Sequence, residues 1–596
     1  MRDLLLSLGL GVAMLPAQAL PDVVQGFAPF DLDGDGRAEV RSLEVLAEVG
    51  DPKSPLVVVL VERRLWSSPE AAAQPALVAA LHTNLARFAG DIAAGGTRVL
   101  LLATEVHHGP PHQDGRTVLA MRRLFQRLHA VAPMQAAVLV GHFPDALLVR
   151  TCNWRRNEKL ELPGKDGQPV AFAETATNVR CVPEYVAHRC DLVLADLDGD
   201  WERRYVPGPV DLPSVTCVFG DAVPDAGGSC QAMRTGALRV VDVFHVRDGA
   251  AVPDAAAFAV RLDAADRDHE CAAADRLLGN PLARPDIAVS RLDARGLAWW
   301  PELRALDVDA TVGNVRVKGF DLAGDDKATA VQWEPNDAEE LRLLNGYFDR
   351  NHSFRTRPLP AEQHKPASIA HGLGSGLNEL RAASAAWGDF RADGYDLQDA
   401  TLLDLLHWLQ RPAVLRTLRA HSDGYFAAFA RSDVDQLARE LGTPWHWTRY
   451  GQRLSPSWSD HQGGRADFVF YRAMHDQKVL PDSPFLLLHT GCEALSPPHA
   501  VELAYDDPRY GRFAHAESLL FFTPCLAMLG RAKVFYDEPR EFAAVLGQGG
   551  TIGDAWRHYF ELESQAKDWN EVGGDIGRKR AYFWSIVGDC TLRLPR

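Results

Sequence analysis

Buried strands alternate with amphipathic helices in the first quarter of the chain, and this alternation limits the fold more than any other feature. Apolar runs at Pro55–Val61, Val99–Leu102 and Ala136–Gly141 predict strands that are covered on both faces. Helical patterns separate these runs at Leu77–Ile92 and Leu119–Val131. Such an alternation predicts an α/β fold with a mostly parallel sheet flanked by helices.

The alternation returns in the second half of the chain, beyond a segment rich in cysteine, proline and glycine. A strand is predicted at Asp286–Val289, and later elements are predicted as helices at Leu402–Leu409 and Val434–Leu441 and as strands at Ala413–Leu418 and Phe485–Leu488. The 596 residues exceed what one ordinary core holds. We therefore divide the chain into a signal peptide (1–19), an N-terminal segment with an acidic loop (20–50), a first α/β subdomain with a cysteine-rich insertion (51–320) and a second α/β subdomain (321–596).

The N-terminus has the features of a secretion signal. Arg2 precedes an apolar run, Leu4–Leu15, and Ala17-Gln18-Ala19 then gives the small-x-small pattern of a cleavage site. The run is too short to span a bilayer, so we predict a cleaved signal peptide and a mature chain that begins near Leu20. The alternative is an ordinary N-terminal helix. We expect export to the periplasm, the cell surface or the exterior, and no later stretch predicts a membrane span.

Cysteine usage and net charge limit the site types and partners. Six of the nine cysteines form one cluster, and an even cluster in an exported protein predicts up to three disulfides of open connectivity among Cys152, Cys181, Cys190, Cys217, Cys230 and Cys271. No C-x-x-C pair occurs, which argues against a zinc ribbon or a thioredoxin-type site. The net charge of −16 argues against a nucleic-acid partner, since such a partner requires a basic face.

Two predicted strands each end in a turn that carries a reactive side chain. His421 follows the strand Ala413–Leu418, and Cys492 follows the strand Phe485–Leu488. Groups beyond the carboxyl ends of neighbouring parallel strands meet in one crevice. A nucleophilic cysteine needs a nearby base and backbone N–H groups that bind an oxyanion. His421 and Cys492 meet these needs if their strands are adjacent.

Each of these signals has a structural alternative. A lone cysteine after a strand is more often a core residue, and a lone histidine is more often structural. His489 is an alternative base, but its position three residues before Cys492 makes the pairing geometry awkward, so we prefer His421. Glu493 is a candidate to orient a histidine. Cys525 lies in an apolar segment, which favours a core position.

Several segments, in this order, resemble the gingipain-type cysteine peptidases of the caspase-like fold. The strand–His–helix–strand–Cys order is similar to theirs. The four segments that carry the rest of the resemblance are Val138–Pro144, Ala195–Trp201, Pro285–Leu292, which is similar to a PD-x-x-V-G-R strand with Ser290 in the glycine place, and Gly588–Leu594, which is similar to G-D-P-T-L-R-L with Cys590 in the proline place.

The resemblance implies a fold of two side-by-side α/β subdomains with the catalytic pair in the second. It implies that His421 is the general acid/base and Cys492 the nucleophile, with no cofactor required for catalysis. Ser422, Gly424 and Gly491 then form the turns that supply the oxyanion site, although the family has glycine where Ser422 stands. The implied substrate is a protein or peptide, cut after Arg or Lys. The alternative function is a binding or structural protein that keeps the scaffold without catalysis.

An acidic loop near the N-terminus resembles the start of a calcium-binding loop. Asp31, Asp33 and Asp35 alternate before Gly36, and Glu39 falls at position 9. No bidentate glutamate follows at position 12, and the alternative is a solvated acidic turn. Asp196, Asp198 and Asp200 form a similar, weaker candidate for calcium. His107, His108 and His112 suggest a metal site less strongly, because no spaced carboxylates or cysteines accompany them.

Overall fold

The computed structural model describes residues 19–108, 115–152, 161–163, 169–171, 184–199, 201–206, 218–220, 238–239, 246–247, 250–251, 284–298, 316–317, 320–321, 336–386, 395–422, 424–442, 464–496, 514–532, 539–565 and 581–595. Apart from Ala19, the predicted signal peptide lies outside the described residues. The positions of His112 and Asp200 also lie outside them.

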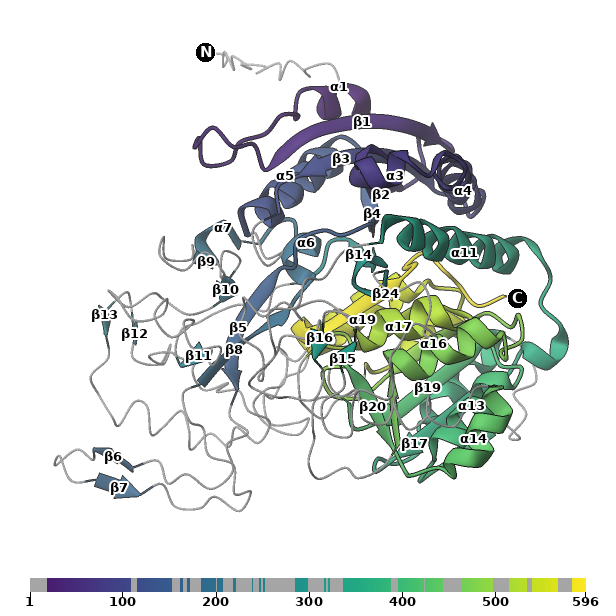
Figure 1. The fold of residues 1–596 in the computed structure, drawn as a ribbon. Coiled ribbons are helices and arrows are strands. Elements are labelled where there is room, and N and C mark those ends of the chain that lie inside the picture. Colours follow the sequence, from purple (N-terminus) through teal and green to yellow (C-terminus); the bar gives the residue numbers. More distant parts are fainter. Residues whose placement is uncertain are drawn as a thin grey trace, which may run out of the picture.

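One large sheet runs through the molecule and is flanked by helices (Figure 1). Its eleven strands lie in the order β1-β3-β2-β4-β14-β24-β23-β22-β19-β17-β18. Within this sheet, the antiparallel pairs are β1–β3 and β23–β24. The predicted α/β class, with a mostly parallel sheet between helices, is therefore confirmed.

The first half of the sheet forms because its strands are apolar on both faces. All seven residues of β2 are buried, as are all but the first and one further residue of β3. The elements of this half are β1 (Val40–Val49), β2 (Leu56–Glu62), α4 (Pro75–Ala94), β3 (Arg98–Val106), α5 (Gly115–Val131), β4 (Met134–Val140) and β14 (Ala288–Leu292).

The second half repeats this plan, and local signals set its helix ends. Thr401 and Asp404 form a capping box at the start of α13, and Gly442 ends α14 in the left-handed region. The elements of this half are α11 (Asp337–Thr356), β17 (Pro366–His371), β18 (Tyr395–Leu397), α13 (Leu402–Gln410), β19 (Leu415–Ala420), α14 (Val434–Leu441), α16 (Phe468–Gln477), β22 (Phe485–His489), α17 (His515–Phe522), β23 (Cys525–Arg531), α19 (Ile552–Gln565) and β24 (Trp584–Gly588).

Shorter elements connect these layers. They are α1 (Leu20–Gln25), α2 (Arg64–Ser67), α3 (Pro69–Ala72), α6 (Leu192–Ala195), α7 (Trp201–Arg204), α12 (Leu377–Leu380), α18 (Phe542–Gly547) and the pairs β6 (Glu161–Pro163) with β7 (Pro169–Ala171), β12 (Val246–Arg247) with β13 (Ala250–Ala251), β15 (Arg316–Val317) with β16 (Phe320–Asp321) and β20 (Phe426–Phe429) with β21 (Gly464–Asp467). Among the described residues, no helix is both long and apolar enough to cross a bilayer.

Helix α11 joins the two halves of the molecule. The Asn84 side-chain amide of α4 donates to Asn345 Oδ1 at 2.8 Å, and the Tyr347 hydroxyl donates to the Leu526 carbonyl of β23 at 2.6 Å. Most buried apolar residues of both halves belong to one continuous core. The two halves are therefore packed as one body along α11.

Two elements differ from expectation for physical reasons. β19 begins and ends two residues later than predicted; its end is later because Arg419, a polar residue that argues against continuing the apolar run, is accommodated inside the strand. Helix α11 was not predicted, since its polar start reads as a boundary. Its acidic first turn is buried there by arginine partners from other elements, including Arg64 and Arg472.

The cysteine-rich segment contributes a second sheet, in the order β11-β8-β5-β10-β9, formed by β5 (Leu147–Cys152), β8 (Glu184–Arg189), β9 (Tyr205–Val206), β10 (Val218–Gly220) and β11 (Leu238–Arg239). Cys190 follows β8 and is not part of a disulfide: its buried thiol donates to the Tyr582 carbonyl at 3.2 Å. This removes Cys190 from the predicted disulfide cluster. The side chains of the other five cysteines of the cluster lie outside the described residues.

Candidate active site

The strands that precede His421 and Cys492 are direct neighbours. β19 pairs in parallel with β22, with Leu415 opposite Leu486 and Leu418 opposite His489. His421 follows the last residue of β19, and Cys492 lies three residues beyond the last residue of β22. Both side chains therefore follow the carboxyl ends of adjacent parallel strands, where groups from separate loops meet.

A hydrogen bond joins the two turns directly. The Ser422 hydroxyl donates to the Cys492 carbonyl at 2.6 Å. Gly491 lies under this contact, because a Cβ at Gly491 would stand 2.1 Å from Ser422 Oγ and 2.6 Å from the Ala420 carbonyl. No other residue type fits at position 491 without moving the histidine turn away. Ser422 and Gly491 thus hold the two turns together.

The chain bends sharply directly after Cys492. Glu493 has a φ of 52°, in the left-handed region that non-glycine residues seldom adopt. Cys492 is 8% exposed, and Glu493 is 5% exposed. Strained residues of this kind concentrate at functional sites, and a tight turn releases backbone N–H groups from the sheet, as oxyanion binding requires.

The His421 turn is anchored on two sides. A Cβ at Gly372, which follows β17, would lie 3.0 Å from His421 Cδ2 and 3.2 Å from Nε2, so the imidazole stacks closely on this glycine. The His421 carbonyl accepts from Ala428 N at 2.7 Å, and the Gly424 carbonyl accepts from His515 N at 2.9 Å. Gly424 therefore anchors the turn to α17 through its carbonyl.

His489 has a structural role that the sequence did not suggest. Gly491 N donates to His489 Nδ1 at 3.1 Å, and His489 Nε2 lies 2.9 Å from His515 Nε2. Since Nδ1 accepts, the neutral ring carries its proton on Nε2 and donates it to His515. Both ring nitrogens therefore already have hydrogen-bond partners, so neither is available to act as a base for Cys492. His515 lies 26 residues further along the chain, and no local pattern links the two rings.

Burial keeps this histidine pair neutral. The pKa of His489 is lowered well below its usual value by burial, with further contributions from His515 and Arg531. Burial also lowers the pKa of His515, to about 3. Arg531 Nε donates to the Gly491 carbonyl at 3.3 Å. The support beneath the cysteine turn is therefore an uncharged imidazole pair beside one buried guanidinium.

Other buried cysteines are poor nucleophile candidates. Cys525, at the start of β23, is fully buried, and burial raises the pKa of its thiol to about 12. Burial likewise raises the pKa of Cys590 to about 12. Both thiols stay protonated at neutral pH.

The strand ends of the first half carry a dense ion-pair network. Arg64 binds Glu62 with two nitrogens, each at 2.9 Å, and binds Glu340 at 2.8 and 2.9 Å. His142, after β4, donates its N–H to Glu62 at 2.8 Å, and its Nδ1 lies 2.6 Å from Asp293 after β14. Burial opposes ionisation of Glu62, but the charge of Arg64 outweighs it and lowers the pKa of this carboxyl.

Two segments that carried the family resemblance have structural contacts here. Arg291 in β14 donates Nε to Asp191 at 2.9 Å and Nη1 to the Phe143 carbonyl at 3.1 Å. Asp589, after β24, accepts from Asn351 at 2.9 Å and from Arg355 at 2.5 Å. These buried charged residues fix loops to the sheet, and neither contacts His421 or Cys492 through these bonds.

The acidic N-terminal loop brings three of its four predicted ligands together. Carboxylate oxygens of Asp31, Asp33 and Glu39 lie within 4.8 Å of one another. The carboxylate of Asp31 accepts from Gly34 N and Gly36 N, both at 2.8 Å. Asp35 is not part of this group, and its carboxylate accepts from Arg37 N at 2.7 Å. Carboxylate oxygens are the ligand type that a hard cation such as calcium prefers. One of these carboxylates, that of Asp33, also accepts from Arg116 Nη1 at 2.5 Å.

The second acidic candidate groups Asp196 and Asp198 with Asp286, and Asp200 lies outside the described residues. Asp196 is buried and accepts from Gly199 N at 3.0 Å and from the Trp201 indole at 2.9 Å. Burial, with hydrogen bonding to Asp198, raises the pKa of Asp196 to about 7. Its carboxyl is therefore already hydrogen-bonded within its own turn.

Comparison with known proteins gives a fold likeness at low similarity. No protein-family model and no curated protein match the chain. Among solved structures, the Arg-specific cysteine proteinase gingipain R matches with a TM-score of 0.39 and 10% identity, over 91% of this chain and 79% of that chain. The complex of the Porphyromonas gingivalis RgpB pro- and mature domains matches with a TM-score of 0.38 and 9% identity, over 90% of this chain and 79% of that chain. At these values, conclusions about function rest on the residues of this chain.

Proposed function

We propose that this protein is an exported cysteine endopeptidase with Cys492 as nucleophile and His421 as general acid/base. The observation that carries the proposal is the contact of the two turns beyond β19 and β22, where the Ser422 hydroxyl binds the Cys492 carbonyl. This contact joins the turn that carries His421 to the turn that carries Cys492. Nucleophilic catalysis by cysteine requires this pairing.

The proposed reaction proceeds in two steps. His421 accepts the proton of the Cys492 thiol, and the thiolate attacks the carbonyl carbon of the peptide bond. Backbone N–H groups of the cysteine turn bind the oxyanion, His421 returns the proton to the leaving amine, and a thioester remains. Water, deprotonated by His421, then attacks the thioester carbon, which releases the carboxylic acid and restores the thiol. No cofactor takes part in these steps.

The proposed substrate is a protein or peptide chain with Arg or Lys before the cut bond. The net charge of −16 favours basic substrates by electrostatic attraction. A peptide library presented to the purified mature protein tests this preference. Cleavage after acidic or apolar residues would contradict the specificity while leaving the nucleophile assignment intact.

A non-catalytic scaffold is the second candidate, and the surroundings of Cys492 favour it in one respect. Cys492 is 8% exposed, and the buried residue that follows it is an acid, Glu493. A neighbouring carboxylate disfavours the thiolate that attack requires. A peptide with a thiol-reactive warhead separates the two functions. Labelling of Cys492 that slows in His421→Ala supports the peptidase, whereas no labelling and no cleavage of any peptide would support the scaffold.

Export remains part of the proposal and rests on the N-terminal residues. Mass spectrometry of protein from its native host should find a mature chain that begins near Leu20. It should also find oxidised cysteines within Cys152–Cys271, with Cys190 as a thiol because its Sγ binds the Tyr582 carbonyl. An intact Met1 with reduced cysteines throughout would overturn export.

A further inference from the structure

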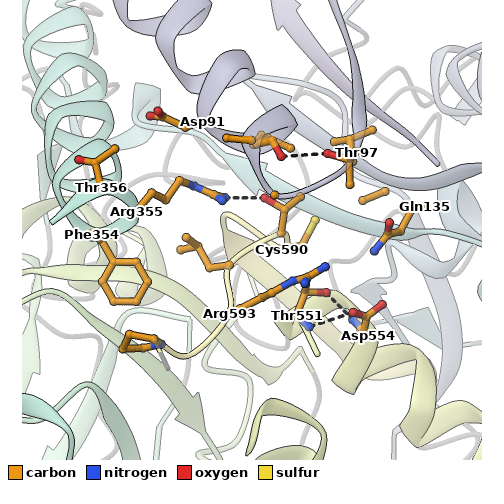
Figure 2. A pocket seen from close by; sticks show the side chains of 18 of the residues that line it. Asp91, Thr97, Gln135, Phe354, Arg355, Thr356, Thr551, Asp554, Cys590 and Arg593 are labelled. Carbon is orange, nitrogen blue, oxygen red and sulfur yellow. Dashed lines mark hydrogen bonds between the residues drawn. The ribbon is translucent and has the colours of Figure 1, made fainter. Parts of the chain in front are cut away.

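A cavity of about 490 Å³ opens far from the proposed catalytic pair (Figure 2). It is lined by residues near the starts of strands in the first half of the sheet, among them Val57 of β2, Ala136 of β4 and Ala288 of β14. His364, which precedes β17, also lines it, whereas Gly372 under His421 follows β17. The six residues of β17, about 20 Å of strand, therefore separate the cavity from His421.

Three arginines line this cavity. Arg355 and Arg357 come from the end of α11 and the residue after it, and Arg593 follows β24. Arg355 is fixed by bonds from Nη2 to Asp589 and Thr591, at 2.5 and 2.6 Å. Within the described part of the chain, the guanidinium groups of Arg357 and Arg593 form no hydrogen bond or ion pair. Two exposed guanidinium groups with no described partner thus border one cavity in a protein whose net charge is −16.

The carboxylates of the same cavity have other partners. Asp91 lies 2.8 Å from His352 Nδ1, and Asp554, in the first turn of α19, accepts from the N–H of the capping residue Thr551 at 2.9 Å. Figure 2 shows Asp554 turned toward Thr551, with Arg593 beside this pair. These acids are therefore held in bonds of their own, and the two guanidinium groups keep their capacity for an outside anion.

The remaining wall is apolar. Apolar side chains of the lining include Ile92, Phe354, Leu359 and Leu592, and Figure 2 shows the Phe354 ring beside the cavity. Cys590 adds a thiol that stays protonated because burial raises its pKa to about 12. A volume of about 490 Å³ falls in the range of small-molecule sites, which combine apolar walls with a few fixed polar groups.

We propose that this cavity is a binding site for a small organic acid, with its carboxylate on Arg357 and Arg593 and its apolar body against Phe354 and Leu359. Arginine is the side chain suited to carboxylates, because its planar fork donates two parallel N–H groups. The site is separate from the proposed catalytic pair, so it is independent of whether the protein is a peptidase.

Isothermal titration calorimetry with 4-phenylbutyrate and its neutral amide, 4-phenylbutyramide, tests the site. The acid should bind the wild-type protein at least tenfold more tightly than the amide, and added salt should weaken the binding of the acid but not that of the amide. Arg357→Gln and Arg593→Gln should each weaken the acid about tenfold, as expected for loss of a charge-assisted hydrogen bond. Neither variant should change the affinity for the amide.

Arg439→Gln, at an exposed position on α14, is the matched control and should leave the affinity for the acid unchanged. Equal affinities for acid and amide would overturn the proposal, as would equal losses in the Arg439 and Arg593 variants. Absence of acid binding at roughly 10 mM would also overturn it. Arg593→Lys, which keeps the charge and loses the fork, should fall between wild type and Arg593→Gln.

Discussion

The two halves of the sheet place very different polar groups at equivalent positions. In the first half, the end of β2 carries Glu62, which pairs with Arg64 at 2.9 Å, and Arg64 also pairs with Glu340 of α11 at 2.8 Å. In the second half, the strand ends carry His421 and Cys492, supported by imidazoles that burial keeps uncharged. The topology gathers side chains at strand ends in both halves, and residue type decides what they do there.

The difference separates a structural role from a chemical one. Buried charges in mutual ion pairs cannot be removed singly without leaving an unpaired charge, so they fix loops and resist proton exchange. A thiol and an imidazole have ordinary pKa values near neutrality and exchange protons readily. We therefore expect changes at His421 and Cys492 to alter chemistry at little cost in stability, and changes in the ion pairs around Arg64 to do the reverse.

The largest expected effect is that of Cys492→Ala on peptidase activity. Loss of the covalent step should lower the rate by several orders of magnitude, while the midpoint of urea unfolding should change little because Cys492 lies in a turn and is not part of the apolar core. Initial rates on a peptide substrate and urea unfolding curves measure both. An active Cys492→Ala protein would end the nucleophile assignment.

His421→Ala should be nearly as inactive, and the double variant scarcely worse than either single one. Residues that act as a unit lose activity in this non-additive way. If the fold-losses in rate of the two single variants multiply in the double variant, His421 acts separately from Cys492. The comparison between the halves would then fail, because the second half would hold no coupled pair.

In the first half, Arg64→Ala should cost about 3–5 kcal/mol in the free energy of unfolding. The change leaves the buried carboxylates of Glu62 and Glu340 without their shared cation. Urea unfolding monitored by tryptophan fluorescence gives the value. Arg41→Ala is the matched control: its pair with Glu105 is about half exposed and should be worth less than about 1 kcal/mol.

The imidazole pair predicts a pH dependence of stability. An unfolded histidine binds a proton near pH 6.5, whereas buried His515 does so only at about 3. The unfolded state therefore binds more protons between these values, and stability, complete above pH 6.5, falls as the pH decreases. His515 alone should remove about 2 kcal/mol between pH 6.5 and 5.

Unfolding free energies of wild type and His515→Phe across this range test the effect. The variant should be less stable at pH 7, because His489 loses its acceptor, yet its stability should fall less steeply with decreasing pH. His82→Gln, exposed on α4, is the control for removing a histidine. Parallel curves for wild type and His515→Phe would contradict the neutral pair.

The sequence predicted elements and strand-end positions well, but not the partners that fix them. Continuous apolar runs revealed β2 and β22, and the His421 and Cys492 turns followed from chain order. The link between His489 and His515, and the role of Gly491 beneath Ser422, depend on contacts between distant segments. Helix α11 was missed because its acids are polar in sequence and become buried only when distant arginines neutralise them.

A smaller effect is expected for Cys525→Ala, which compares a core thiol with the proposed nucleophile. Cys525 is fully buried in β23, so the loss of its sulfur should lower stability by about 1–2 kcal/mol and leave activity unchanged. With its pKa raised to about 12, native Cys525 should resist iodoacetamide at pH 8 while Cys492 reacts. Peptide mapping after a short exposure measures both sites.

The smallest expected effect concerns calcium at the N-terminal loop, which we propose as a binding site formed by Asp31, Asp33 and Glu39. Arg116 already donates to Asp33 at 2.5 Å, and a cation must compete with it. Added calcium should therefore raise the melting temperature only slightly; at tenfold excess over the dissociation constant, the gain in stability is about 1.4 kcal/mol.

Arg116→Gln sharpens this test, because it shows whether the ion pair of Arg116 with Asp33 competes with calcium for this carboxylate. The variant removes the competing guanidinium, so it should bind calcium more tightly and show a larger calcium-dependent rise in melting temperature than wild type. Asp33→Asn should abolish the rise in both backgrounds, and magnesium should give a smaller one, since the irregular loop offers no octahedral set of oxygens. Melting temperatures that are identical with calcium and with chelator, in wild type and Arg116→Gln alike, would leave the loop as an arginine-paired acidic turn.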